Sequence, residues 1–220
     1  MNGSRPEVAL ASAADLLAAL HRGQVSHLRQ DVDGRLVAGG PTPPALLCGS
    51  FNPLHDGHLR LAEVAAGKLG VPVAFELSLV NADKPPLSHD EVQRRLQPFV
   101  GWHVVWLTRT ATFAEKAGLF PRTVFVVGAD TAVRVVAPRF YGDSVATMCQ
   151  ALECLRAASC RFIVAGRIDG AGGYVAADSV PIPPQFRDLF VGISAAEFRV
   201  DLSSTELRRL NGNDARRGRG

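Results

Sequence analysis

The sequence lacks long apolar runs and is poor in cysteine. No stretch approaches the roughly 18 apolar residues of a membrane-spanning helix, so we expect no membrane span. Residues 8–20 are interrupted by Asp15 and are rich in alanine, which argues against a signal-peptide core. We therefore expect a cytoplasmic protein, with the nucleus as the alternative. The four cysteines show no CxxC spacing, which favours reduced, mostly buried thiols over a zinc site or a disulfide framework.

Lysine is also scarce. Only Lys68, Lys84 and Lys116 occur among the 24 basic residues, and the others are arginines. Arginine binds phosphate oxygens through a planar fork, so this excess suits a nucleotide-binding protein, although a GC-rich genome produces the same bias. The formal net charge of +3 creates no strong field, and we expect no specific nucleic-acid partner. Residues 211–220 are expected to form a disordered tail.

The length of 220 residues fits one domain that buries roughly 70% of its unfolded surface. Near the start of the chain, apolar residues recur at helical spacing from Leu10 to Leu20, and Gly23 ends the pattern. An Asp-Gly turn signal and a stiff Pro-Thr-Pro-Pro segment follow. We therefore predict an N-terminal helical extension with a proline-rich connector at residues 1–44, and the working domain at residues 45–210.

Short apolar strands alternate with helical segments throughout the predicted domain. Several of them are nearly continuous apolar runs, which is typical of strands covered on both faces. The pattern predicts an α/β fold with a Rossmann-like, doubly wound parallel sheet and helices on both faces. In such sheets, ligands bind beyond the carboxyl ends of the strands, where the strand order reverses. The expected strands are residues 45–51, 73–80, 103–107, 123–127, 161–165 and 189–193.

The segment GSFNPLHDGH at residues 49–58 is the most informative feature of the chain. It follows an apolar strand, breaks at Gly49 and turns through Asn-Pro into a helix whose first turn carries His55 and His58. Three residues apart, the two imidazoles share one helix face, where free backbone N–H groups and the positive end of the helix dipole also point. The segment therefore predicts a phosphate site. Histidines at this spacing can also chelate zinc, but no third ligand is nearby in the sequence.

These residues resemble the signature of the nucleotidyltransferase superfamily that includes the nicotinamide mononucleotide adenylyltransferases, in which GSFxP is paired with HxGH. Every fixed position of that signature is filled. The resemblance implies that His55 and His58 are catalytic residues that donate to the α- and β-phosphate oxygens of ATP. It also implies contacts from four residues of the turn. The ATP-binding residues are Gly49, Ser50 and Phe51, and the substrate-binding residue is Asn52.

A second constellation lies near the end of the predicted domain, at residues 201–208. As a local signal, Ser203 or Ser204 caps a helix that Glu206 joins as a capping-box partner. The superfamily carries an ISSTxxR motif near its C-terminus, and residues 202–208 reproduce this motif with leucine in place of isoleucine. The implied ligands of the terminal phosphate of ATP are Ser203, Ser204 and Thr205, and the implied catalytic clamp on pyrophosphate is Arg208.

A third match is Lys84, which precedes a predicted helix at residues 89–97. In relatives, a lysine near this place contacts the phosphate of the mononucleotide substrate, so Lys84 is a candidate substrate-binding residue. Alternatively, Lys84 belongs to a loop without a binding role, and Ser88 caps the helix that follows. The two interpretations are compatible.

A fourth match is the segment at residues 108–113 together with the Gly-x-Asp element at residues 128–130. Adenylyltransferases of this type place the Gly-x-Asp element against the nucleotide ribose, so we assign Gly128 and Asp130 to ATP binding. Helix capping is the alternative for Asp130. In relatives, the earlier segment borders the pyridine pocket. Thr108 and Phe113 are therefore candidate substrate-binding residues, with a place in the core as the alternative for Phe113.

The resemblance implies an adenylyltransferase that joins nicotinamide mononucleotide and ATP to give NAD and pyrophosphate. We expect Mg²⁺ to arrive on ATP and no resident metal, because no acidic cluster resembles a metal cage. Nicotinate mononucleotide, phosphopantetheine or a CTP-dependent acceptor are the alternatives within the superfamily. A nucleotide sensor without turnover and a metal-dependent hydrolase are alternatives from other classes. Self-association into a homo-oligomer is left open.

Overall fold

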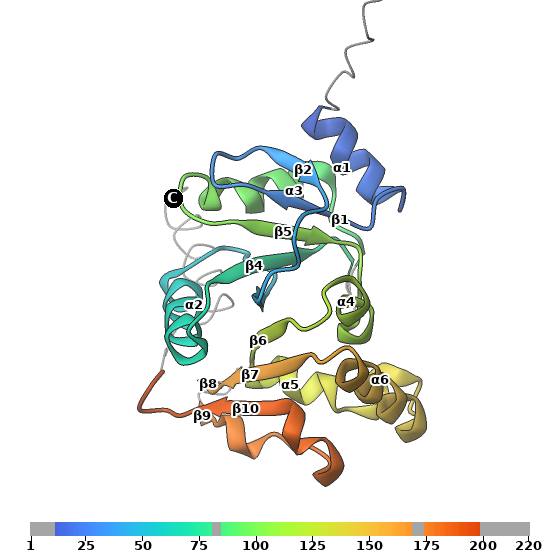
Figure 1. Ribbon diagram of the computed structural model, residues 1–220, viewed down its shortest axis with the longest axis vertical. Coiled ribbons are helices and arrows are strands. Elements are labelled where there is room, and N and C mark those ends of the chain that lie inside the picture. The colour runs from blue at the N-terminus through green and yellow to red at the C-terminus, as the bar shows by residue number, and fades with distance from the viewer. Residues whose placement is uncertain (1–11, 81–84, 169–173, 199–220) are drawn as a thin grey trace, which may run out of the picture.

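The computed structural model describes residues 12–80, 85–168 and 174–198, and an eight-stranded sheet lies at its centre (Figure 1). The strands of this sheet are β1 His27–Gln30, β2 Leu36–Ala38, β3 Ala45–Cys48, β4 Val73–Ser78, β5 Val105–Thr108, β6 Val124–Gly128, β7 Arg161–Ala165 and β10 Phe190–Ile193. Their order is β10-β7-β6-β3-β4-β5-β1-β2. The strands from β10 to β5 in this order are parallel, whereas β1 is antiparallel to both of its neighbours. Two short strands, β8 Arg167–Ile168 and β9 Tyr174–Val175, pair separately.

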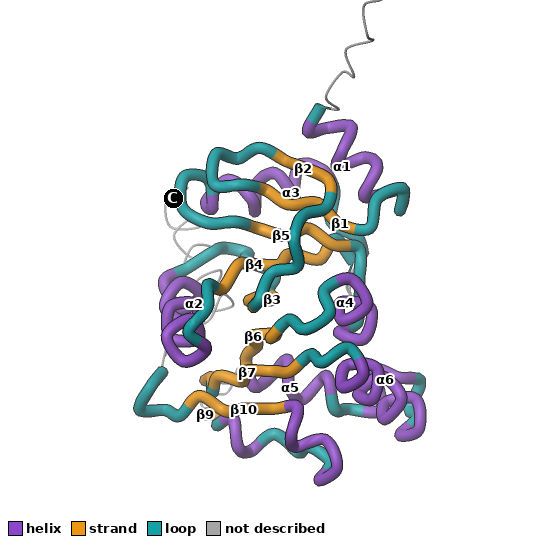
Figure 2. Tube along the Cα trace, in the orientation of Figure 1, coloured by secondary structure: helices purple, strands orange, loops and turns teal. Residues whose placement is uncertain are grey.

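In the described part of the chain, six α-helices cover the two faces of the sheet (Figure 2). They are α1 Ala13–His21, α2 Asp56–Leu69, α3 His89–Leu96, α4 Phe113–Leu119, α5 Ala129–Val135 and α6 Val145–Ala157. The first three helices form one core with strand residues such as Leu47, and the last three form another with residues such as Leu46. Adjacent strand residues point to opposite faces, which is why the strands are apolar throughout. Figure 1 shows α2 and α4 on opposite sides of the sheet.

The six strands expected from the sequence are all present, and the fold is the predicted Rossmann-like α/β sheet with helices on both faces. From β3 the chain adds β4 and then β5 on one side of the sheet, and it then crosses to add β6 and β7 on the other side. The strand order therefore reverses between β3 and β6. The chain leaves these two neighbouring parallel strands after Cys48 and after Gly128, so the segments that follow them start at the switch point.

The residues before β3 also contribute to the sheet. The β1–β2 hairpin closes through the expected Asp-Gly turn, in which the Gly34 N–H donates to the Asp31 carbonyl at 2.9 Å. β1 pairs with β5, so the sheet contains strands from both sides of residue 44, where the sequence places the end of the extension. Helix α1 lies before this hairpin and is capped by Ser12, whose Oγ accepts the Asp15 N–H. Within the described ranges, no helix combines the length and apolarity needed to cross a membrane.

Candidate active site

The turn between β3 and α2, residues 49–55, is shaped by Gly49 and Phe51. The Gly49 N–H donates to the Glu76 carbonyl at 3.1 Å, which continues the β3–β4 pairing by one residue. A Cβ at Gly49 would lie 2.8 Å from the Phe51 ring, so glycine is required there for space. Phe51 is in the left-handed region with φ of 43° and is 1% exposed. The ring of Phe51 packs edge-on against that of His58, with 5.1 Å between centroids, and so links the turn to the helix.

The structure brings the two histidines together at the N-terminus of α2. His55 is the residue before the helix and His58 lies in its first turn, and their rings stack with centroids 3.7 Å apart. The His55 backbone N–H donates to His58 Nδ1 at 3.3 Å. A neutral imidazole that accepts at Nδ1 carries its proton on Nε2, so the distal nitrogen of His58 is a donor. The pair therefore combines N–H donors with the positive end of a helix dipole, which suits a phosphate.

Helix α3 holds the β3–α2 turn from the side. Arg95 Nη1 donates to the Ser50 carbonyl at 2.8 Å, and Arg94 Nη2 donates to Asn52 Oδ1 at 2.7 Å. Glu91 orients both guanidinium groups through bonds of 2.7–2.8 Å. These bonds, chiefly the one from Arg94, lower the pKa of Glu91 to about 2. Two of the predicted site residues are thus held in place by side chains that the motif does not contain.

The Gly-x-Asp element lies across the switch point from this turn. Gly128 ends β6 and is the residue before α5, and Asp130 is exposed in the first turn of that helix. Since β6 pairs directly with β3, the two predicted nucleotide segments leave neighbouring strands at the same edge of the sheet. The assignments of Gly128 and Asp130 to ATP binding stay predictions.

Thr108 is buried, and Phe113 is half-buried against the core. Thr108 is fully buried, and its hydroxyl donates to Glu76 Oε1 at 2.6 Å. The ring of Phe113 packs edge-on against Phe125 and Phe162, with centroids 5.3 and 5.1 Å apart. These contacts belong to the core between the sheet and helices α4–α6, which matches the alternative interpretation of Phe113. The assignments of Thr108 and Phe113 to substrate binding stay predictions.

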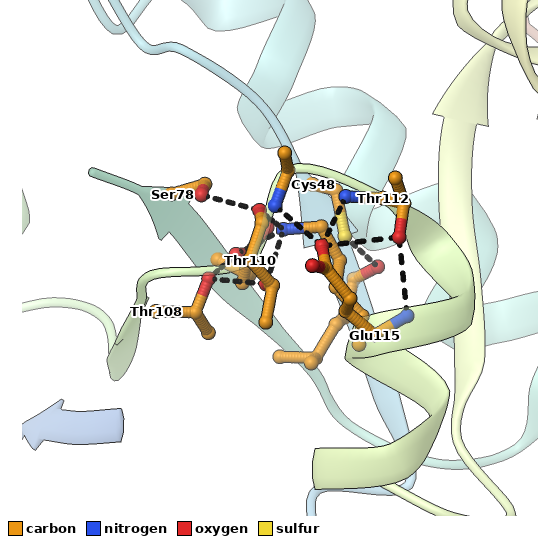
Figure 3. Close-up of polar contacts among 10 residues, drawn as sticks. Cys48, Ser78, Thr108, Thr110, Thr112 and Glu115 are labelled. Atoms are coloured by element: carbon orange, nitrogen blue, oxygen red, sulfur yellow. Dashed lines mark hydrogen bonds and ion pairs between the residues drawn. The ribbon is translucent and has the colours of Figure 1, made fainter. Parts of the chain in front are cut away.

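A buried polar network near the ends of β4 and β5 contains one predicted site residue, Thr108, and is otherwise made of residues that the motifs do not include (Figure 3). Its centre is an ion pair between Glu76 and Lys116, which are 1% and 5% exposed. Thr108, Thr110 and Ser78 extend it towards the start of α4. Burial, reinforced by the carboxylate of Glu76, raises the pKa of the neighbouring Cys48 thiol. The sequence gives only a weak sign of this network, because Glu76 is an acidic residue inside the otherwise mostly apolar strand β4.

A match to a family model over most of the chain shows the family of this protein. Residues 46–210 match the model of the family described as cytidylyltransferase-like. The chain belongs to the cytidylyltransferase-like family. No curated protein matches the chain.

Membership of the cytidylyltransferase-like family confirms the nucleotidyltransferase superfamily that the sequence motifs indicate. The match includes both signature segments, residues 49–58 and 202–208. Five predicted site residues lie outside the described residues: Lys84, Ser203, Ser204, Thr205 and Arg208. Their roles stay predictions. Among the described residues, no group of three or more His, Cys, Asp or Glu side chains is arranged to hold a metal ion.

Proposed function

We propose that this nucleotidyltransferase is an adenylyltransferase that joins nicotinamide mononucleotide to ATP and releases pyrophosphate, with NAD as the product. The observation that supports the proposal is the pair of stacked imidazoles, His55 and His58, at the N-terminus of α2 and at the switch point of the sheet. Both substrates are phosphates, and this arrangement offers N–H donors to phosphate oxygens.

In the proposed reaction, a phosphate oxygen of the mononucleotide attacks the α-phosphorus of ATP in line. A new P–O bond forms between the two nucleotides, and the bond from the α-phosphorus to the oxygen of pyrophosphate breaks. No nucleophilic side chain is required, because the protein contributes alignment and neutralisation of negative charge. His58 Nε2–H and the His55 ring would donate to the α- and β-phosphate oxygens.

The remaining contacts of the proposal come from the sequence motifs. Arg208 would bind the leaving pyrophosphate, and the hydroxyls of residues 203–205 would bind the terminal phosphate. Asp130, exposed in the first turn of α5, would accept hydrogen bonds from the ribose hydroxyls. Mg²⁺ would enter as part of the MgATP substrate.

A CTP-dependent transfer is the second candidate, because the family to which the chain belongs is described by cytidylyl transfer. The proposed chemistry is identical in that case, and only the base differs. Nicotinate mononucleotide is the alternative acceptor within the adenylyl reaction, since it differs from nicotinamide mononucleotide by a carboxylate in place of a carboxamide.

The test is pyrophosphate release by the purified protein with Mg²⁺, each of ATP and CTP, and each of three acceptors: nicotinamide mononucleotide, nicotinate mononucleotide and phosphopantetheine. We expect the highest kcat/KM for ATP with nicotinamide mononucleotide. A higher kcat/KM for CTP, or for another acceptor, replaces this substrate assignment. Measurable MgATP binding without release of pyrophosphate from any pair would instead support a sensor without turnover.

A further inference from the structure

The ion pair between Glu76 of β4 and Lys116 of α4 is almost fully buried. Lys116 Nζ lies 2.5 Å from Glu76 Oε1, and the side chains are 6% and 2% exposed. Removing two charges from water is expensive, and replacing a buried pair by uncharged side chains of similar volume is often neutral or stabilising. A buried pair of this kind is therefore weak evidence for a role in stability alone.

The network around the pair holds the β5–α4 loop, residues 109–112, from its inner side. Ser78 Oγ donates to the Thr110 carbonyl at 2.6 Å, and Lys116 Nζ lies 3.4 Å from Thr110 Oγ1. The Thr110 hydroxyl also lies 2.9 Å from that of Thr108, which donates to Glu76. Both the backbone and the side chain of Thr110 are therefore held, although Thr110 lies in a loop.

The same loop is held from its outer side by Glu115. Glu115 Oε2 accepts the backbone N–H groups of Ala111 and Thr112, both at 2.8 Å, and the Thr112 hydroxyl at 3.0 Å (Figure 3). Thr112 in turn caps α4 by accepting the Glu115 N–H. The β5–α4 loop is thus held by hydrogen bonds within the chain on both of its sides.

Glu76 also connects this loop to the β3–α2 turn. Its backbone carbonyl accepts the Gly49 N–H, while its carboxylate binds Thr108 and Lys116. One residue therefore holds the starts of two segments at the carboxyl edge of the sheet, where ligands of such folds bind. The loop itself exposes Arg109 and Ala111 to solvent at that edge.

We propose that the Glu76–Lys116 pair is a positioning device that fixes the β5–α4 loop in the conformation that receives the acceptor substrate. The inference rests on the proposed nucleotidyl transfer. A loop that is ordered during folding loses less conformational entropy when the substrate binds, so its rigidity lowers KM for the acceptor. Glu76 and Lys116 act through the loop and do not touch the reacting atoms.

The test is the double variant Glu76→Gln with Lys116→Met, which removes both charges and preserves the volumes. The amide introduced in β4 can still accept the Thr108 hydroxyl, but the thioether introduced in α4 cannot donate to Thr110. We expect about tenfold faster amide hydrogen exchange at Ala111 and Thr112, and about a tenfold higher KM for nicotinamide mononucleotide. KM for ATP should stay within about twofold of its wild-type value. The matched control is Glu153→Gln with Arg156→Met, which removes an exposed ion pair of α6.

Unchanged exchange in the loop, or an equal rise of KM for both substrates, would overturn the proposal. Ser78→Ala is the second variant, for the case in which the double variant does not fold. It removes one hydrogen bond to Thr110 and no charge. We expect it to raise KM for the acceptor by a smaller factor and to leave KM for ATP unchanged. If wild-type protein releases no pyrophosphate with any acceptor, the proposed function fails instead. The exchange measurement then still decides whether the pair holds the loop.

Discussion

The β3–α2 turn and the β5–α4 loop leave the same edge of the sheet but are built in different ways. The turn depends on local relations: Gly49 makes space for a ring two residues away, and His55 binds a residue three positions later. The loop has local bonds to Glu115 but also depends on contacts across long sequence separations, since Glu76 of β4 binds Thr108 of β5 and Lys116 of α4. Local relations leave a motif in the sequence, whereas distant ones do not.

The β3–α2 turn and the β5–α4 loop also differ in their expected roles. The turn presents imidazoles and backbone N–H groups at a helix N-terminus, where an anion is stabilised. On its inner side, the loop is held by the charges of Glu76 and Lys116, which are buried. We therefore expect substitutions in the turn to affect the chemical step, and substitutions below the loop to affect substrate binding.

The largest effect is expected at His58. His58→Asn keeps an oxygen that can accept the His55 N–H but removes the distal N–H donor. We expect kcat to fall on the order of 10²–10³-fold, as for loss of one preorganised donor, with little change in thermal stability. Steady-state pyrophosphate release and a melting curve measure the two quantities.

His58→Gln is the matched control, because it returns an N–H near the position of Nε2. We expect it to recover activity to within about tenfold of wild type. A His58→Asn variant that keeps kcat within about threefold of wild type would refute the donor role, since that factor is under about 1 kcal/mol of barrier.

A smaller effect is expected at Arg95, which fixes the Ser50 carbonyl. Arg95→Met should lower kcat/KM by about tenfold and the free energy of unfolding by about 1–2 kcal/mol, because it removes charged hydrogen bonds of the β3–α2 turn. Arg156→Met is the control, since Arg156 makes similar bonds to Asp188 and to the Gln185 carbonyl, away from the turn. Equal activity of the two variants would show that the turn does not need Arg95.

The smallest effect is the pH dependence of the Glu91 contacts. The pKa of Glu91 is lowered from 4.5 to about 2 by its bonds to Arg94 and Arg95. Its stabilisation is therefore complete above about pH 4.5 and is lost as the pH falls through about 2. Glu91→Gln should cost no more than about 1 kcal/mol at pH 6, as is usual for ion pairs near the surface.

The measurement is urea unfolding of wild type and Glu91→Gln at pH 6 and at acidic pH. The difference in unfolding free energy should shrink as the pH approaches 2. A difference that stays constant would remove Glu91 as the source of this pH dependence.

Much of the fold was predictable from the sequence because the parallel strands are buried on both faces. Runs such as Val124–Gly128 are apolar at nearly every position, so the positions of six strands along the chain could be predicted from hydrophobicity. The β1 and β2 strands were not predicted as part of the sheet. Both strands are short and half-polar, β2 lies at the edge of the sheet, and the pairing of β1 with β5 depends on a distant partner.

In the candidate site, the proximity of the two histidines was predictable from the sequence. His55 and His58 lie together as their spacing indicates. Thr108 is predicted from its place in a motif, whereas its hydrogen bond to Glu76 depends on a neighbouring strand that the motif does not contain. The contacts of Arg94 and Arg95 with the turn depend on how α3 packs, which no local pattern reports.

The most direct test of the account is amide hydrogen exchange of the full chain with and without a non-hydrolysable MgATP analogue. We expect slower exchange at residues 49–58 and 128–130, on both sides of the switch point, and little change at the β5–α4 loop until nicotinamide mononucleotide is added. Protection elsewhere on the molecule, with no change at residues 49–58, would contradict the claim that the histidine pair binds the phosphates of ATP.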